Sequence, residues 1–259
     1  MYHYTKTDAV SALKSLGITA GDTLFIHSNI GFFGIPEGER SADNANKTLL
    51  AALLEVLGDN GTLVVPTFTY SFSNGQSFDP DNSLSDCGRF AEFIRMHPDS
   101  VRSTDPHVSV AALGKKAIQL TQNVSKNAYA ENSFFARFFQ EGGKVCNFNF
   151  DTGSTLVHYI ERLLNVPYRF DKAFTGTISS QGQEQEDCFT IYVRDTSTDA
   201  TIADFTTLDK LAVEQNLYQK ATLGRGFIGV ISIRDKYQLI KDELQLNPNL
   251  LIKGEYCEK

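Results

Sequence analysis

A histidine and a glutamate stand three residues apart in the stretch FNFDTGSTLVHYIERLLNVPYRF, residues 148–170. Residues at positions i and i+3 share one face of a helix, so His158 and Glu161 can meet. A histidine titrates near neutral pH, which suits a general base, and a carboxylate can orient its ring. The Gly/Ser/Thr turn just before them places His158 near a helix start, where open α/β sheets hold their ligands. A polar pair that only decorates a helix surface is the alternative.

A second polar pair, His27 and Ser28, ends the apolar run DTLFIHS and leads into the loop NIGFFG. Polar groups at the end of a strand, followed by a glycine-containing loop, suit a ligand whose oxygens need backbone donors. Side chains that merely cap a turn are the alternative. A third cluster, Asp105 and His107 in RSTDPHVS, is ordinary turn chemistry when taken alone.

The composition is that of a globular protein with an acidic balance. Of 259 residues, 41% are hydrophobic and 21% are charged, and the net charge is −7. This charge argues against a nucleic-acid partner, which usually meets a basic face. No run of about 18 apolar residues predicts a membrane span, and the first residues lack the layout of a signal peptide. We therefore expect a cytoplasmic protein without a membrane partner.

Several other chemistries find no support in the sequence. The four cysteines lie far apart without a CxxC pair, so neither a disulfide framework nor a zinc or other metal site is expected. GRGFIG, residues 224–229, matches the dinucleotide fingerprint in letters, but a predicted strand follows it where the fingerprint needs a helix. No P-loop, HExxH or GxSxG motif is present.

The segments that must position these side chains alternate between helix and strand. In chain order the first four are TKTDAVSALKSLG, DTLFIHS, NKTLLAALLEVLG and TLVVPTFTY. This αβαβ order predicts an α/β domain with central strands. A helix over about 154–165 follows the predicted strand KVCNFNF, and past residue 170 DCFTIYVRD and GVISIRD predict further strands. We expect a single domain over 1–259, a central mixed sheet flanked by helices, with a more β-rich C-terminal third.

Taken together, these blocks resemble the aminoglycoside 3-N-acetyltransferase family, also called antibiotic N-acetyltransferases. The resemblance covers about residues 4–250. It rests on the ordered set GDTLFIHSNI, LGDNGTLVVPTFTY, VRSTDPHVSVAALG, NSFFARF and TGSTLVHYIE. It implies an α/β fold distinct from the GNAT fold, and an acyltransferase that uses acetyl-CoA as cosubstrate and needs no metal.

The resemblance also implies roles for particular residues. The histidine of STLVHYIE is His158, a catalytic base, and Glu161 or Asp105 would support it. Ser109 of HVSVAALG resembles the serine that helps to hold the donor. The CoA-binding segment corresponds to His27, Ser28, Asn29, Ile30, Gly31, Phe32, Phe33 and Gly34.

Two departures bear on the acceptor. The chain has Asp105-Pro106 where many antibiotic-modifying members have His-Pro, and VPYRFDKAFTG follows the catalytic helix. This combination resembles the branch found in polysaccharide and O-antigen gene clusters, and it predicts a nucleotide-linked amino sugar as acceptor. A pyrophosphate and a flat base favour cations and aromatic rings. The predicted acceptor contacts are Tyr70, Phe72, Tyr168, Arg169, Lys172 and Arg225.

Three alternatives stay open. The acceptor could be an aminoglycoside. The chain could be a hydrolase with Ser28 or Cys146 as nucleophile and His158 as base. It could also be a non-catalytic module that binds CoA or a sugar. A homodimer is left open as well.

Overall fold

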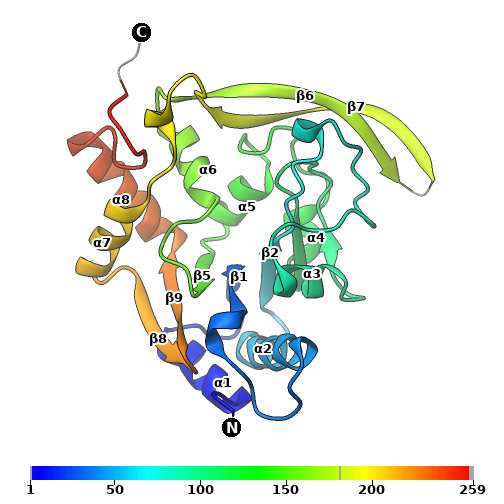
Figure 1. Ribbon diagram of the computed structural model, residues 1–259, viewed down its shortest axis with the longest axis vertical. Coiled ribbons are helices and arrows are strands. Elements are labelled where there is room, and N and C mark those ends of the chain that lie inside the picture. Colours follow the sequence, from blue (N-terminus) through cyan, green and yellow to red (C-terminus); the bar gives the residue numbers. More distant parts are fainter. Residues whose placement is uncertain (1, 181, 257–259) are drawn as a thin grey trace.

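The structure is a computed structural model that describes residues 2–180 and 182–256. Within these residues the centre is a seven-stranded sheet in the order β3-β4-β2-β1-β5-β9-β8 (Figure 1). β1 (Thr23–Ser28) pairs in parallel with β2 (Thr62–Pro66) and with β5 (Lys144–Phe148). The antiparallel pairs add β3 (Val101–Arg102), β4 (Val110–Gly114), β8 (Gln219–Leu223) and β9 (Gly226–Ser232). The predicted α/β fold with a mixed sheet is confirmed.

The central strands form because their side chains are apolar and are buried on both faces of the sheet. In β1, Leu24 and Ile26 enter one core, and Phe25 enters the core on the other face. His27 lies two residues beyond Phe25 and therefore points to the same face as Phe25. Because β1 and β5 are parallel neighbours, their carboxyl ends meet at one edge of the sheet, which is where such sheets hold ligands.

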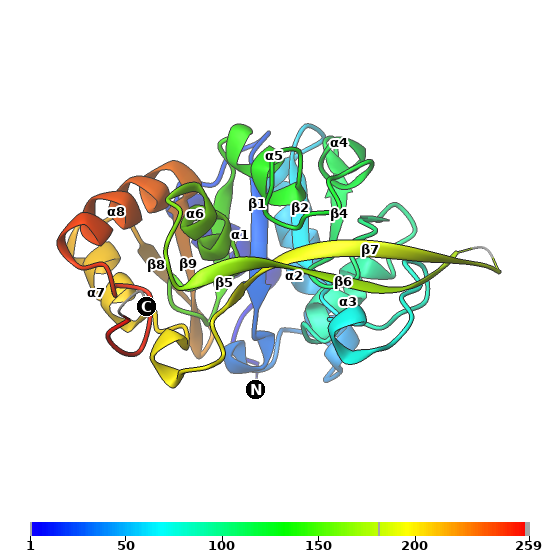
Figure 2. The ribbon, with the colours of Figure 1, turned by 90° about the horizontal axis from the view of Figure 1, so that it is seen from above.

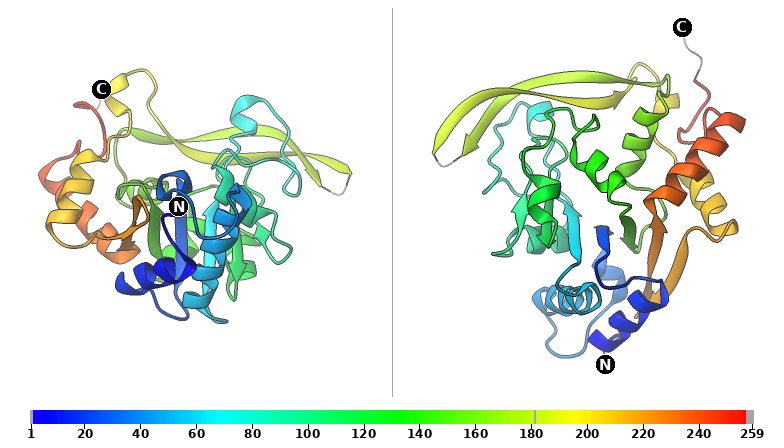
Figure 3. Two further views of the ribbon diagram at one scale, coloured as in Figure 1. Left: turned by 60° about the horizontal axis from the view of Figure 1, so that its bottom comes forward. Right: turned by 180° about the vertical axis from the view of Figure 1, so that it is seen from behind.

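Helices cover both faces. One face carries α1 (Lys6–Ser15), α2 (Ala42–Leu57) and α3 (Arg89–Arg95). The other carries α4 (Ala117–Thr121), α5 (Phe134–Gln140), α6 (Leu156–Leu163), α7 (Thr206–Glu214) and α8 (Ile233–Leu246). In the right-hand view of Figure 3, α1 and α2 lie below the sheet, and α5 and α6 lie above it. Among the described residues, no helix has the length and apolarity that a membrane span needs.

A long β-hairpin crosses the molecule outside the main sheet (Figure 2). It consists of β6 (Arg169–Ser180) and β7 (Gln183–Arg194). Phe78 pairs with the outer edge of β6, and residues 126–128 pair with β7 at Thr190. Together with β8 and β9, the hairpin gives the predicted β-rich C-terminal third. The predicted acceptor contacts Arg169 and Lys172 lie on β6, the first strand of this hairpin.

Candidate active site

His158 occupies the first turn of α6 and is bonded to Glu161 one turn further along. Its Nδ1 lies 2.6 Å from Oε2 of Glu161, and the Glu161 side chain has no exposed surface. The same Oε2 lies 2.7 Å from Nε of Arg169, the first residue of β6, which is 6% exposed. Arg169 thus gives the buried carboxylate a second charged partner, and this offsets part of the cost of removing its charge from water.

This arrangement fixes the chemistry of the imidazole. A carboxylate can only accept, so Nδ1 donates its proton to Glu161 and Nε2 is left with a free lone pair. Burial lowers the pKa of His158, and the charges of Arg169 and Lys236 lower it further, while Glu161 acts in the opposite direction. The ring is therefore neutral at neutral pH. A partly exposed imidazole in this state is able to take a proton at Nε2.

Two aromatic rings border the imidazole. The Tyr129 and Phe205 rings have centroids 6.1 Å and 6.2 Å from that of His158. Phe205 also packs over Gly153, where an added Cβ would come within 2.7 Å of the ring. The backbone N–H of Gly153 donates to the exposed carboxylate of Asp151 at 3.0 Å. The turn before α6 therefore packs against Phe205, a neighbour of the base, and itself carries an exposed carboxylate.

Asp105, the second predicted supporting carboxylate, holds its own turn. Its Oδ1 accepts from the backbone N–H groups of His107 and Val108 at 2.8 Å and 2.9 Å. Burial raises the pKa of Asp105 to about 6, against the effect of those two bonds. The His107 ring packs 5.0 Å from that of Phe174 beneath the hairpin. Of the two carboxylates, Glu161 is the one bonded to His158.

His27, at the end of β1, carries two buried ring nitrogens that have no hydrogen-bond partner among the residues that the structure describes. Its register partner on β5 is Asn147, whose Oδ1 is likewise buried and unpartnered. Burial, aided by the charge of Lys236, lowers the pKa of His27 to about 3, so the ring is neutral. Two adjacent unsatisfied polar side chains at the ligand edge of a sheet are unusual, since buried polar groups are normally paired.

The predicted donor loop follows directly. The backbone N–H of Asn29 donates to Phe148 O of β5 at 2.9 Å, and residues 30–33 form the short helix η1 (Ile30–Phe33). Within it Phe33 is buried and Phe32 is 61% exposed. A hollow of about 500 Å³ opens beside the loop, lined by Ile30, Gly31 and Gly34 together with Arg40 and Arg89. A second hollow of about 650 Å³ shares Ala42 and Arg89 with it, so the two adjoin.

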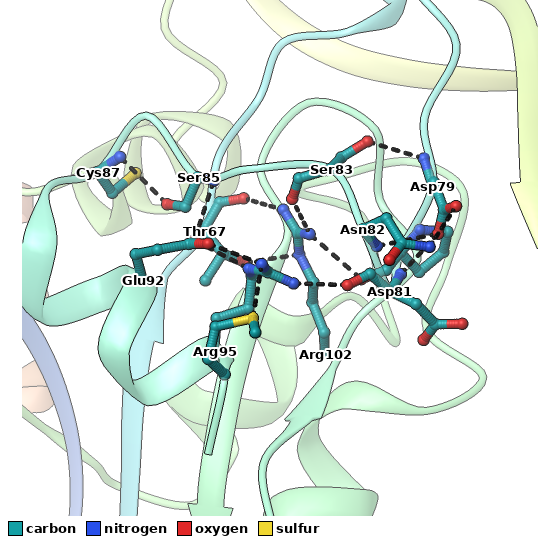
Figure 4. A network of polar contacts seen from close by, with 12 residues as sticks. Thr67, Asp79, Asp81, Asn82, Ser83, Ser85, Cys87, Glu92, Arg95 and Arg102 are labelled. Carbon is teal, nitrogen blue, oxygen red and sulfur yellow. Dashed lines mark hydrogen bonds and ion pairs between the residues drawn. The ribbon is translucent and has the colours of Figure 1, made fainter. Parts of the chain in front are cut away.

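Ser109, the other predicted donor residue, is bonded to Thr67 and Arg102, which belong to a polar network with the loop of residues 79–87. Figure 4 shows Thr67 and Arg102 in this network, beside Asp79, Ser83 and Ser85 of the loop. Ser109 has no exposed surface, and its hydroxyl donates to Thr67 O at 2.6 Å. Arg102 joins this network through Thr67 O at 2.8 Å and Ser83 O at 2.6 Å, and so ties the loop to the sheet. Ser109 therefore braces a wall of the larger hollow, and direct contact with the donor stays a prediction.

The six predicted acceptor contacts do not form one exposed surface. Phe72 and Tyr168 are buried, at 4% and 1% exposure, and burial together with the Glu161 charge raises the pKa of Tyr168. Arg169 is the ion-pair partner of Glu161. The other three are on the surface: Tyr70 is 41% exposed, Lys172 lies on the hairpin, and Arg225 lies in the β8–β9 turn beside Phe33 O.

Several residues near the site were not anticipated from the sequence: Tyr129, Asn147, Phe205 and Lys236. Asn147 lies on β5 and Lys236 on α8, where the periodic pattern marks only a buried face. Tyr129 and Phe205 lie outside the helices and strands, where no periodic pattern exists to single them out. Cys146 belongs to that core with no exposed surface, and burial raises the pKa of its thiol, which removes it as a nucleophile. Among the described residues no group of His, Cys, Asp or Glu side chains could hold a metal ion.

The scaffold is shared with proteins of known structure. The solved structure of AAC-IIIb in a binary complex with CoASH matches with a TM-score of 0.81 at 22% identity, covering 98% of each chain. This likeness defines the class of fold, a mixed α/β sheet of the antibiotic N-acetyltransferase type.

The sequence gives the family. The chain belongs to the aminoglycoside 3-N-acetyltransferase family, whose match spans residues 25–245. Aminoglycoside N(3)-acetyltransferase VII of Streptomyces paromomycinus is 29% identical over 184 residues, which cover 63% of this chain and 62% of that enzyme. Aminoglycoside N(3)-acetyltransferase IV of Salmonella sp is 26% identical over 256 residues, covering 97% and 91%. The predicted family is confirmed, whereas the branch from polysaccharide gene clusters stays a prediction.

Proposed function

We propose that this protein is a CoA-dependent N-acetyltransferase that moves an acetyl group from acetyl-CoA to an amine of an aminoglycoside-type amino sugar. The observation that carries the proposal is the 2.6 Å contact between Nδ1 of His158 and the wholly buried carboxylate of Glu161. It leaves Nε2 as an aimed base at the ligand edge of the sheet. Membership in the family supplies the reaction class.

The chemistry follows from this geometry. The acceptor amine attacks the thioester carbonyl, so a C–N bond forms as the C–S bond breaks. His158 takes the amine proton at Nε2, and the resulting imidazolium is stabilised by Glu161. The proton then passes to the thiolate of CoA, which leaves as the thiol. No covalent acyl-enzyme is required, and the buried thiol of Cys146 offers no nucleophile for one.

The donor would lie along the two adjoining hollows. CoA carries a pyrophosphate and a 3′-phosphate, and arginine is suited to phosphate recognition. Arg40 and Arg89 line the hollow beside the predicted segment 27–34. The same hollow includes Ser41, the N-cap of the 16-residue helix α2, whose N-terminus also favours anions.

The acceptor side supports a cationic sugar better than a nucleotide-linked one. Arg169, which we expected to meet a pyrophosphate, is held by Glu161, and Tyr168 is buried beneath it. The turn that leads into the helix of His158 carries the exposed carboxylate of Asp151. A polycationic aminoglycoside needs such carboxylates, because each ammonium group gains from an opposite charge.

Substitution of His158 tests the proposed base. His158→Ala should lower kcat by at least about 10²-fold, because positioned base catalysis is lost, while acetyl-CoA binding survives. His97→Ala is the matched control, since His97 is a surface histidine beside Asp99. Release of CoA thiol measures turnover, and calorimetry measures donor binding. A His158→Ala protein with wild-type kcat would refute the mechanism.

A substrate panel tests the acceptor. We expect kcat/KM to be higher for kanamycin-type aminoglycosides than for nucleotide-linked amino sugars. The reverse preference would restore the nucleotide-linked acceptor and leave acetyl transfer intact. Binding of CoA without turnover of any amine would instead indicate a non-catalytic module.

A further inference from the structure

Lys236 is a wholly buried lysine whose amine faces the turn that precedes the catalytic helix. It lies in the first turn of α8 and has no exposed surface. Its Nζ donates to Thr152 O at 2.5 Å and to Ser154 Oγ at 2.8 Å. Among the described residues no carboxylate oxygen lies within 4.0 Å of this nitrogen.

A lysine in this position destabilises the fold. A buried ammonium loses its hydration, and without a carboxylate partner no ion pair offsets this loss. Burial lowers the pKa of Lys236 to about 7, with the charge of Asp151 acting in the opposite direction. An apolar side chain of similar length would fill the same space without this cost. The amine therefore has a role through its two hydrogen bonds or through its charge. The hydrogen bonds hold the turn before the catalytic helix, and the charge lowers the pKa of His158.

The two hydrogen bonds of Lys236 act on the last residues of a turn that other elements also hold. Asp209 on α7 accepts from Thr152 N at 2.9 Å, and Nδ2 of Asn147 on β5 donates to Asp151 O. Among the described residues, the Lys236 amine is the side-chain partner of Thr152 O and of Ser154 Oγ, which lie directly before α6. Thr155, the N-cap of α6, makes no side-chain capping bond. The helix instead begins with bonds from Val157 N to Ser154 O and from His158 N to Thr155 O. Lys236 binds the residues on which this first turn rests, and His158 is the third residue of the helix.

We propose that Lys236 is a positioning residue for His158: its buried amine fixes the Thr152–Ser154 turn and so sets the direction of the imidazole. The inference rests on the proposed acetyl transfer for its kinetic effect. It also has a consequence that needs no activity, because the amine shares the electrostatic surroundings of His158.

The titratable and charged groups in these surroundings come from several elements. They are His27 on β1, Asp151 on the β5–α6 loop, His158 and Glu161 on α6, Arg169 on β6, Asp209 on α7, which accepts from Thr152 N, and Tyr129, whose ring borders His158. Lys236 and Arg169 lower the pKa of His158, and Glu161 raises it. In the pH range where His158 titrates, below its usual value, Lys236 carries its proton. Removal of Lys236 must therefore raise the pKa of His158.

The test is Lys236→Met, with Lys241→Met on the same helix as control. We expect kcat to fall between about 10- and 100-fold, as for other small misplacements of a catalytic group, and KM for acetyl-CoA to change little. The acid limb of kcat/KM should move to higher pH, because the unprotonated base is lost earlier as pH falls. In parallel, ¹³C-histidine NMR should show the His158 resonance, identified by its absence in His158→Ala, titrating at higher pH. Lys241→Met should change none of these.

Wild-type kcat together with an unmoved His158 titration would overturn the proposal. Because Lys236→Met could fail to fold, Ser154→Ala provides a second route: it removes one acceptor and keeps the charge. It should lower kcat several-fold and leave the acid limb in place, whereas unchanged kcat would count against positioning. If no amine is ever acetylated, the proposed function fails, but the NMR titration still decides whether Lys236 acts on His158.

Discussion

At the scale of single residues, the site depends on one carboxylate with two partners. Glu161 meets His158 at 2.6 Å and Arg169 at 2.7 Å, through the same oxygen. Glu161→Gln should therefore have two effects. We expect kcat to fall by about 10² to 10⁴, because the ring loses its orientation and the imidazolium its counter-charge. We also expect about 3 kcal/mol of destabilisation, because Arg169 is left buried without a partner.

A double variant separates these two effects. Glu161→Gln with Arg169→Met removes the orphaned charge, so part of the stability should return in urea denaturation while kcat stays low. The pH profile of the single variant provides an independent check. Glu161 raises the pKa of His158, so Glu161→Gln should move the acid limb of kcat/KM to lower pH. Lys236→Met should move the same limb to higher pH. Recovery of kcat in the double variant would show that Glu161 matters only for folding.

The sequence predicts part of this site. The spacing of His158 and Glu161 is sufficient to place them on one helical face, because a bond across one turn is a local property. Arg169 is different: it meets Glu161 only because β6 begins directly over α6, and its position beside Tyr168 and Phe170 favoured an acceptor contact. Lys236 comes from α8, 78 residues beyond His158 in the chain. Contacts of this range follow from the tertiary packing, which the local pattern does not encode.

At the scale of elements, the predicted donor loop is braced by two neighbours. The N-terminal segment bonds it through His3, whose Nδ1 accepts from Ile35 N at 2.9 Å. The β8–β9 turn packs on its other side, where Arg225 N donates to Phe33 O at 3.1 Å. Gly224 of this turn has a φ of +57°, and a Cβ there would lie 2.2 Å from Phe33 O. The loop has no room for a side chain at this position.

Gly224→Ala should therefore displace η1 and raise KM for acetyl-CoA several-fold, with a smaller change in kcat. Gly17→Ala is the matched control, because Gly17 also has a positive φ, +70°, but no atom within 4 Å of an added Cβ. Both variants bear the backbone strain of about 1 kcal/mol, and only the first has the clash. Steady-state kinetics with varied acetyl-CoA distinguish them. Equal KM values in the two variants would argue that the donor does not use this loop.

Burial decides which strands can be predicted from the sequence. The strands β1, β2 and β5 are buried and apolar, so their residues identify them. No residue of β6 is fully buried, and several, among them Asp171, Lys172 and Ala173, are exposed. A strand whose two faces both meet water has no alternating pattern of apolar residues. β6 is a strand because it pairs with β7 along its whole length. The hairpin was therefore only half anticipated, through DCFTIYVRD.

At the scale of the whole molecule, charge distinguishes the two acceptors. The chain carries a net charge of −7, and the exposed carboxylate of Asp151 lies on the turn before the base. A field of this sign attracts cations over distances of about a Debye length, roughly 10 Å at 0.1 M salt. It concentrates a polycationic aminoglycoside near the site and repels a nucleotide sugar, whose pyrophosphate is negative.

We therefore expect kcat/KM for an aminoglycoside to fall several-fold as salt rises from about 0.02 to 0.5 M. With acetyl-CoA saturating, this dependence reports capture of the acceptor alone. An anionic acceptor should show the opposite slope, because salt screens repulsion as well as attraction. Asp151→Asn should flatten the aminoglycoside slope and raise KM, whereas Asp81→Asn, on an exposed loop of the other layer, should leave both in place. The contrary result would be a kcat/KM for aminoglycosides that does not depend on salt, together with a kcat/KM for nucleotide-linked amino sugars that rises with salt. It would mean that contacts in the pocket outweigh the acidic surface and that the nucleotide-linked amino sugar is the acceptor.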